Sequence, residues 1–145
     1  MEIRKASSKE DFTKCWEAMQ QLRPRLRLDE YLVMSLYMQD EGYKLIYIEE
    51  HDKVLAFCGY RFQTMIHYGR SIYIDDVFTL PKARDQASAL LNYVLQQAKL
   101  AGVQSIHLDS SYQHSEAHRL YLNHGFKIES HHFVLHLKTS EENFG

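Results

Sequence analysis

The feature that most constrains the fold is one strand–helix–strand succession in the second half of the chain. Residues 65–80 ("MIHYGRSIYIDDVFTL") are typical of a turn followed by a long strand, which Pro81 ends. An amphipathic helix is predicted from about Arg84, and Gly102 closes it before a further strand at 104–110. Because a helix connects them, the two strands are expected to lie parallel in one sheet.

The other predicted strands are short. Residues 2–6, 43–50 and 54–62 have strand patterns, and a turn of only three residues separates the last two, which predicts an antiparallel hairpin. Residues 128–137 are expected to form a terminal strand or hairpin. The chain is therefore predicted to be an α/β protein, with a mixed sheet and helices on both faces.

Three further helices are predicted from their end signals. Ser7 and Glu10 match a capping box before apolar residues at helical spacing. Pro24 breaks that helix, and Asp29 can cap a second one. The segment "SEAHRLYLNHGF" (115–126) combines a serine cap, two helical turns and a glycine stop.

The length, net charge and cysteine content narrow the class of protein. A length of 145 residues suits one domain spanning 1–145. A net charge of −2 argues against nucleic acid or an anionic membrane as a partner. The two cysteines, Cys15 and Cys58, form no paired motif, and the charged first residues form no signal peptide. We therefore expect a cytoplasmic protein without a membrane anchor.

Residues 73–91 carry the strongest hint of a ligand. A strand leads through a proline break into a helix whose first turn has small residues, and Lys82 and Arg84 add positive charge. Main-chain amides and the helix dipole at such a helix start favour a diphosphate. An ordinary strand-to-helix turn is the alternative.

Together with the later "AHRLYLNHGF", this arrangement resembles the GNAT acetyltransferase superfamily. The resemblance covers about residues 3–137 in element order and is sharpest over 69–126, where "GRSIYIDDVFTLP" is similar to small-amine acetyltransferases. It implies the GNAT acyl-CoA N-acyltransferase fold, with acetyl-CoA as the acetyl donor. It further implies direct transfer to a primary amine of a small molecule, without a covalent enzyme intermediate.

The resemblance also implies a cofactor site. The superfamily's phosphate loop, Arg/Gln-x-x-Gly-x-Gly/Ala, falls on residues 84–89, where an alanine replaces the central glycine and an aspartate adds a carboxylate. Main-chain amides from Gln86 to Leu90 are expected to hold the diphosphate, and the preceding strand to bond the pantetheine arm. The expected cofactor contacts are Val77, Phe78, Thr79, Arg84, Asp85, Gln86, Ala87, Ser88, Ala89, Leu90 and His114.

Three residues are the candidate catalytic groups. Tyr121 falls on the superfamily's tyrosine that protonates the departing thiolate, a step for which a phenol is suited. Asp75 falls on an acidic position that serves as base or amine ligand in polyamine-type members, and Asp76 competes for that role. Because neighbours on a regular strand face opposite sides, one of the two should face the cleft. A core tyrosine and two solvent carboxylates are the alternatives.

The acceptor site is less clearly marked. Arg25 and Arg27, in "RPRLR", can bind an acceptor carboxylate or phosphonate, although surface charge is the commoner use of such residues. Tyr31, Tyr60 and Tyr112 are candidates for lining the same pocket. The histidines of "SHHFVLHL" lack the carboxylate or cysteine partners of a zinc site, so no metal is expected.

Two other functions compete with this reading. Asp85 and Ala87 motivate a GNAT fold that has lost turnover and serves as a ligand-sensing or partner-binding domain. Acetylation of a protein amine is the second alternative. A homodimer formed through sheet edges is an option that nothing in the sequence specifies.

Overall fold

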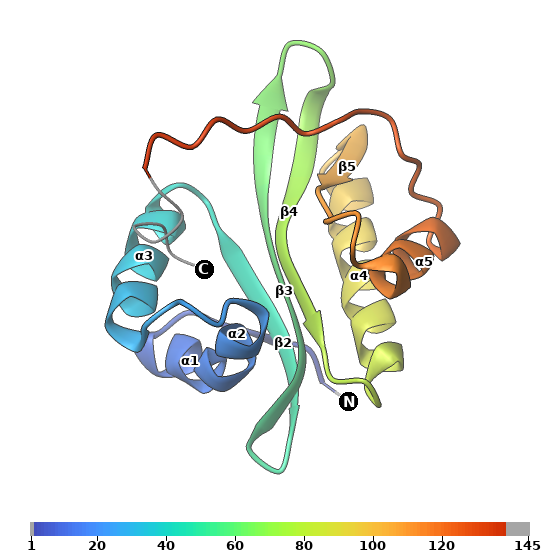
Figure 1. The fold of residues 1–145 in the computed structure, drawn as a ribbon. Helices are drawn as coiled ribbons and strands as arrows, with labels where there is room; N and C mark the ends of the chain where they lie inside the picture. Colours follow the sequence, from blue (N-terminus) through green and yellow to red (C-terminus); the bar gives the residue numbers. More distant parts are fainter. Residues whose placement is uncertain (1, 139–145) are drawn as a thin grey trace.

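The computed structural model describes residues 2–138, which form a five-stranded mixed sheet with helices on both faces (Figure 1). The strands lie in sequence order, and all neighbours are antiparallel except the last two, which are parallel. The predicted hairpins and the predicted parallel crossover are therefore confirmed. The strands are β1 (Arg4–Lys5), β2 (Lys44–Glu50), β3 (Lys53–Met65), β4 (Gly69–Thr79) and β5 (Ser105–Leu108).

The helices divide the core into two layers. Those on one face are α1 (Lys9–Lys14), α2 (Trp16–Leu22) and α3 (Leu28–Asp40), and those on the other side are α4 (Arg84–Leu100) and α5 (Ser115–Asn123). Side chains along β2 point alternately to the two faces of the sheet. Leu45 and Tyr47 pack under α1–α3, and Ile46 and Ile48 pack with α4. Within residues 2–138, no helix is both long and apolar enough to cross a membrane.

The helix ends show where the predicted caps hold. α4 begins at Arg84 as predicted, and Gly102 and Gly125 follow α4 and α5 with positive φ angles of 69° and 93°. The first capping box is shifted by one residue: Ser8 caps α1, and Asp11 rather than Glu10 returns the bond. Asp29 lies within the first turn of α3 and does not cap it.

The terminal strand or hairpin predicted for 128–137 is wrong for this structure. After α5 the chain runs as an extended segment across one end of the sheet toward α3 (Figure 1). A strand forms when its main-chain N–H and C=O groups hydrogen-bond to the edge of another strand. Within the described residues, this segment pairs with no strand. Its apolar side chains Ile128, Phe133, Val134, Leu135 and Leu137 are consequently exposed.

Candidate active site

The strands β4 and β5 separate half-way along β4. Ser71–Ile74 pair with Ser105–Leu108, after which β5 ends while β4 continues to Thr79. Beyond Ile74, the edge of β4 that faces α5 has no neighbouring strand in residues 2–138. Main-chain groups on this edge are therefore available to an extended ligand.

Val77, Phe78 and Thr79 lie in this separated part of β4, and their side chains are committed elsewhere. Val77 packs into the α4 layer, and the Phe78 ring stacks on Phe57 with centroids 5.5 Å apart. The Thr79 hydroxyl lies 2.9 Å from the Leu80 carbonyl oxygen and 2.8 Å from that of Ala83. These side-chain contacts leave the main chain of the three residues as the part that faces the open edge.

The turn into α4 differs from its predicted form. The amides of Gln86 and Ala87 already donate to the carbonyl oxygen of Ala83, at 3.1 and 3.2 Å. Leu90 lies inside the helix and is fully buried, so its amide is not bare either. The amides without a helical acceptor are therefore those of the very first turn, at Arg84 and Asp85. The diphosphate contacts expected from Gln86 to Leu90 stay a prediction.

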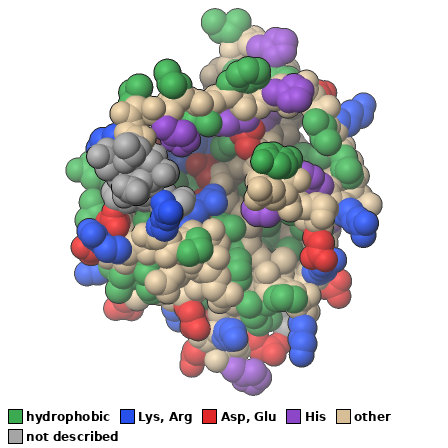
Figure 2. All heavy atoms as spheres, in the orientation of Figure 1, with side chains coloured by type: hydrophobic (Ala, Val, Ile, Leu, Met, Phe, Trp, Pro, Cys, Tyr) green, Lys and Arg blue, Asp and Glu red, His purple; other side chains and the backbone are tan. Residues whose placement is uncertain are grey.

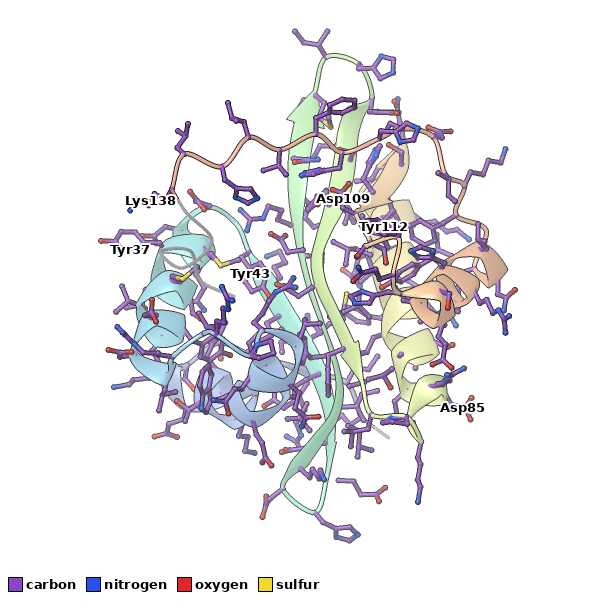
Figure 3. The ribbon with its side chains drawn as sticks, in the orientation of Figure 1. Tyr37, Tyr43, Asp85, Asp109, Tyr112 and Lys138 are labelled. Carbon is purple, nitrogen blue, oxygen red and sulfur yellow. The ribbon has the colours of Figure 1, made fainter. Side chains whose placement is uncertain are left out.

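Ala87 and Asp85, the two residues that depart from the phosphate-loop pattern, have different surroundings. The methyl group of Ala87 is fully buried, so it does not project in front of the first turn. Asp85 is exposed and lies on the outer side of α4 in Figure 3. Ser88 and Ala89 are half-buried and keep this end of the helix slim.

Arg84 makes an ion pair that the sequence did not predict. Its Nη2 atom lies 2.7 Å from Oε2 of Glu116 at the start of α5, and both side chains are exposed. A diphosphate bound at the start of α4 would compete with Glu116 for this guanidinium. His114, the other predicted contact in this region, is exposed and precedes α5 without capping it through its side chain.

Tyr121 projects from α5 into the α4 layer. Its ring packs against that cluster and lies edge-on to Phe126, with centroids 6.0 Å apart. Burial raises the pKa of Tyr121 to about 12, with Cys58 a smaller contributor. The phenol is thus protonated at neutral pH, and no hydrogen bond occupies its hydroxyl within residues 2–138.

A β-bulge changes the expected placement of the two aspartates. Opposite β3, Gly59 pairs with Asp76 and Tyr60 pairs with Ile74, so Asp75 is an extra residue in β4. Asp75 and Asp76 therefore both face the α1–α3 side and line one pocket. The prediction that they face opposite sides is wrong, because it assumed a regular strand.

Each aspartate has its own cationic partner. Asp75 accepts two hydrogen bonds from Arg61, from Nε at 3.0 Å and from Nη2 at 2.9 Å. Asp76 accepts from Arg23 Nη2 at 3.1 Å and from the Tyr43 hydroxyl at 2.9 Å. Burial raises the pKa of Asp75 above its ordinary value, and the Arg61 guanidinium partly offsets that rise.

The pocket that holds these carboxylates lies between α2, α3 and β4 and has a volume of about 280 Å³. Figure 3 shows Tyr43 on its α3 side, and Figure 2 shows basic and acidic side chains side by side in the hollow of this face. Its walls are mostly apolar. They are formed by Met19, Leu26, Tyr31, Met34, Ser35 and Met38, with Arg23, Tyr43, Asp75 and Asp76 as the other polar members.

The predicted acceptor residues are not brought together. Tyr31 lines the pocket, but its hydroxyl donates to the Phe12 carbonyl oxygen at 2.7 Å. Tyr60 is buried in the opposite layer, and Tyr112 is exposed on the β5–α5 connection (Figure 3). Arg27 pairs with Asp29 and Glu30 on the surface.

Arg25 is exposed as well, and neither it nor Arg27 is among the residues that line the pocket. The first arginine of the same "RPRLR" stretch, Arg23, contacts Asp76 instead. Arg23, Tyr43 and Arg61 are the site residues that sequence reasoning missed. These residues are recognisable as site residues only by their contacts with Asp75 and Asp76. Those contacts join different helices and strands, so they can be found only once the arrangement of these elements is known.

Histidines gather along the upper part of this face in Figure 2. His132 Nδ1 lies 3.4 Å from Asp109 Oδ1. Across residues 2–138, no three histidine, cysteine, aspartate or glutamate side chains are placed to hold a metal ion together.

Comparison with known proteins places this chain in a family. The family model described as "Acetyltransferase (GNAT) family" matches residues 7–126. The uncharacterized N-acetyltransferase YhdJ of Bacillus subtilis (strain 168) is 32% identical over 135 residues, which cover 90% of this chain and 95% of YhdJ. The chain belongs to the GNAT acetyltransferase family, whose members use acetyl-CoA.

Solved structures share the fold at low identity. A transcriptional regulator from Bacillus halodurans C-125 has a TM-score of 0.77 and 21% identity, covering 94% of this chain and 99% of its own. The aminoglycoside N-acetyltransferase AAC(6')-Iy, solved in complex with CoA, has a TM-score of 0.77 and 17% identity, covering 94% and 93%. The predicted mixed-sheet GNAT fold is confirmed.

Gly59 is predicted to be essential for the Asp76 contacts. A Cβ atom at Gly59 would lie 1.9 Å from the Tyr43 hydroxyl oxygen, so Gly59→Ala must displace that ring from Asp76. We expect the free energy of unfolding to fall by about 1–3 kcal/mol, measured by urea titration. The same substitution in a Tyr43→Ala background should cost clearly less, and an equal cost in both backgrounds would contradict this contact.

The Arg84–Glu116 pair gives a prediction about the coenzyme. Glu116→Ala releases Arg84, and an exposed pair is worth up to about 1 kcal/mol, so affinity for coenzyme A should rise about two- to fivefold. Isothermal titration calorimetry measures the affinity of each variant for coenzyme A. Glu50→Ala, which removes the same charge from the end of β2, is the control and should leave affinity unchanged. Weaker binding by Glu116→Ala would contradict the competition.

Proposed function

We propose that this acetyltransferase moves the acetyl group of acetyl-CoA directly to a primary amine of a small molecule. The observation that carries the proposal is the bulge of β4. It puts two carboxylates into one pocket on the α3 side, while a protonated phenol projects from α5 into the other layer of the same sheet. Such a pair of groups, one to take a proton and one to give it, suits amine attack on a thioester.

The residues around the separated end of β4 fit the donor. Its extended arm can bond the main chain of Val77–Thr79, and its diphosphate can lie against the first amides of α4 beside Arg84. When bound, acetyl-CoA supplies an activated acetyl carbonyl. In the transfer a C–N bond forms and the C–S bond breaks. An ammonium nitrogen loses two protons in all, of which one goes to the sulfur and the other to a base.

Asp75 and Asp76 serve the incoming amine. Either carboxylate can hold the ammonium form and accept a proton, directly or through one water molecule. Burial raises the pKa of Asp75, which favours this carboxylate as a proton acceptor. The Arg61 guanidinium lowers the pKa of Asp75 and so opposes the effect of burial.

Tyr121 serves the leaving group. Burial raises its pKa to about 12, so the hydroxyl still carries its proton throughout the neutral range and can donate it to a thiolate. The absence of another acceptor for this hydroxyl within residues 2–138 supports that role.

The state of the two cysteines supports direct transfer. Cys15 and Cys58 are both fully buried, and burial raises the pKa of each thiol. A covalent acetyl-enzyme would need an accessible thiolate. The size of the pocket, about 280 Å³, supports a small acceptor, because pockets for drug-sized ligands begin at roughly 300 Å³.

Tyr121→Phe tests the proton donor. We expect kcat to fall about 100-fold or more with little change in coenzyme A affinity, because only the hydroxyl is removed. A thiol-release assay measures kcat. Tyr93→Phe, on α4 in the same layer, is the matched control and should retain wild-type kcat. An unchanged kcat in Tyr121→Phe would rule out the assignment.

Arg61→Gln tests Asp75 through pH. Arg61 lowers the pKa of Asp75, so its removal should raise that pKa and move the acidic limb of the kcat profile to higher pH. Arg70→Gln removes a guanidinium near the other end of the same strand pair and should leave the limb in place. A limb that stays fixed or moves to lower pH in Arg61→Gln would contradict Asp75 as the proton acceptor.

A further inference from the structure

Charged groups of both signs lie at the pocket beside β4. Two carboxylates, Asp75 and Asp76, face two guanidinium groups, Arg61 and Arg23. Arg61 is engaged fully, since it also lies 3.5 Å from Glu41. Arg61 thus contacts two carboxylates while Arg23 contacts one, so Arg23 is the guanidinium with more donors left for a ligand.

Arg23 differs from Arg61 in its position and its spare donors. It follows the last turn of α2, where its amide donates to the Met19 carbonyl oxygen at 2.8 Å, so the backbone fixes its place. Its side chain is 43% exposed whereas Asp76 is 13% exposed, so the guanidinium lies at the mouth and the carboxylate lies deeper. Of its five N–H donors, only those on Nη2 bond within residues 2–138.

This order of charges selects among amines. A simple amine would bring an ammonium group beside Arg23 with no anion to compensate for it. A polyamine or polycationic sugar would bring two or more positive charges beside Arg23 and Arg61 and no anion for either guanidinium. A zwitterion meets both needs, with its ammonium group inside on the aspartates and its own anion outside on Arg23.

The walls of the pocket indicate which uncharged group the ligand carries. Met19, Leu26, Met34 and Met38 give an apolar surface that methionine side chains can adapt to ligands of different shape. The volume of about 280 Å³ leaves room for one short side chain and not for a peptide. The wall therefore favours an apolar side chain on the ligand.

We propose that the acceptor is a free α-amino acid with an apolar side chain, held by its carboxylate on Arg23 and by its amino group on Asp75 and Asp76. The inference rests on the proposed function for the transfer step. The ammonium group loses one proton to an aspartate and becomes a neutral amine, whose nitrogen forms the amide bond and loses a second proton. The C–S bond of acetyl-CoA breaks, the sulfur takes up one proton to leave as the thiol, and the other proton passes to solvent. The product would be an N-acetyl amino acid, which no longer carries an ammonium group.

Binding without transfer is the first test. Isothermal titration calorimetry with L-phenylalanine and phenethylamine, and with L-methionine and 3-(methylthio)propylamine, compares ligands that differ only in the carboxylate. We expect each amino acid to bind the wild-type protein at least tenfold more tightly than its amine. Equal binding, or tighter binding of the amine, would overturn the proposal without any variant.

Two variants then locate the carboxylate. Arg23→Gln should bring the amino-acid-to-amine affinity ratio close to one, and Arg23→Lys should keep part of it, because lysine retains the charge but not the planar fork. Arg27→Gln is the matched control, since that arginine pairs with Asp29 and Glu30 outside the pocket, and should keep the full ratio. An unchanged ratio in Arg23→Gln, with cooperative unfolding intact, would overturn the proposal.

Thiol release with acetyl-CoA separates the two claims. If the amino acids bind through Arg23 but release no thiol, the proposed transfer fails and the binding site stands. If amines without a carboxylate are acetylated as well as the amino acids, transfer stands and the amino-acid acceptor is overturned. Faster release with the amino acids, lost in Arg23→Gln, supports both.

Discussion

The rest of the site depends on one irregularity in the sheet, the extra residue in β4. Without it, Asp75 and Asp76 would alternate across the sheet, and one carboxylate would enter the apolar layer under α4. With it, both carboxylates face the α3 side, while Ile74 and Val77 still pack with α4. The bulge lies where β5 has already ended, so the proposed acceptor pocket and the proposed donor edge adjoin at the same part of β4.

Placing two carboxylates on a half-buried surface costs desolvation free energy unless each carboxylate has hydrogen-bond or ionic partners. Arg61 satisfies Asp75, and Arg23 with Tyr43 satisfies Asp76. Gly59, opposite the bulge, lacks the Cβ atom that would exclude the Tyr43 ring. The polar base of the pocket is thus a set of contacts that depend on one another, which explains why its chemistry and its stability are expected to change together.

The fold was largely predictable from sequence because its signals are local. The helix from Arg84 to Gly102 and its flanking strands follow from proline, glycine and apolar spacing, and these predictions are confirmed. Residues 128–137 have a strand pattern, but a strand exists only when an edge receives it, and sequence does not state which edge is free.

The site was less predictable because it depends on register. Nothing in "YIDDV" reveals that β4 gains a residue against β3, so the facing of Asp75 and Asp76 was wrong. "RPRLR" marked the right segment, but which arginine reaches β4 is decided by where α2 ends. Tyr121 was found because its helix carries a recognisable pattern, and its catalytic role remains a prediction.

A crystal structure with coenzyme A bound tests this account most directly. The account predicts an intact bulge at Asp75, both carboxylates in the pocket beside Tyr43, and the coenzyme sulfur next to the separated end of β4 within reach of the Tyr121 hydroxyl. A regular β4 with the two aspartates on opposite faces, or a coenzyme bound away from β4 and α4, would contradict it.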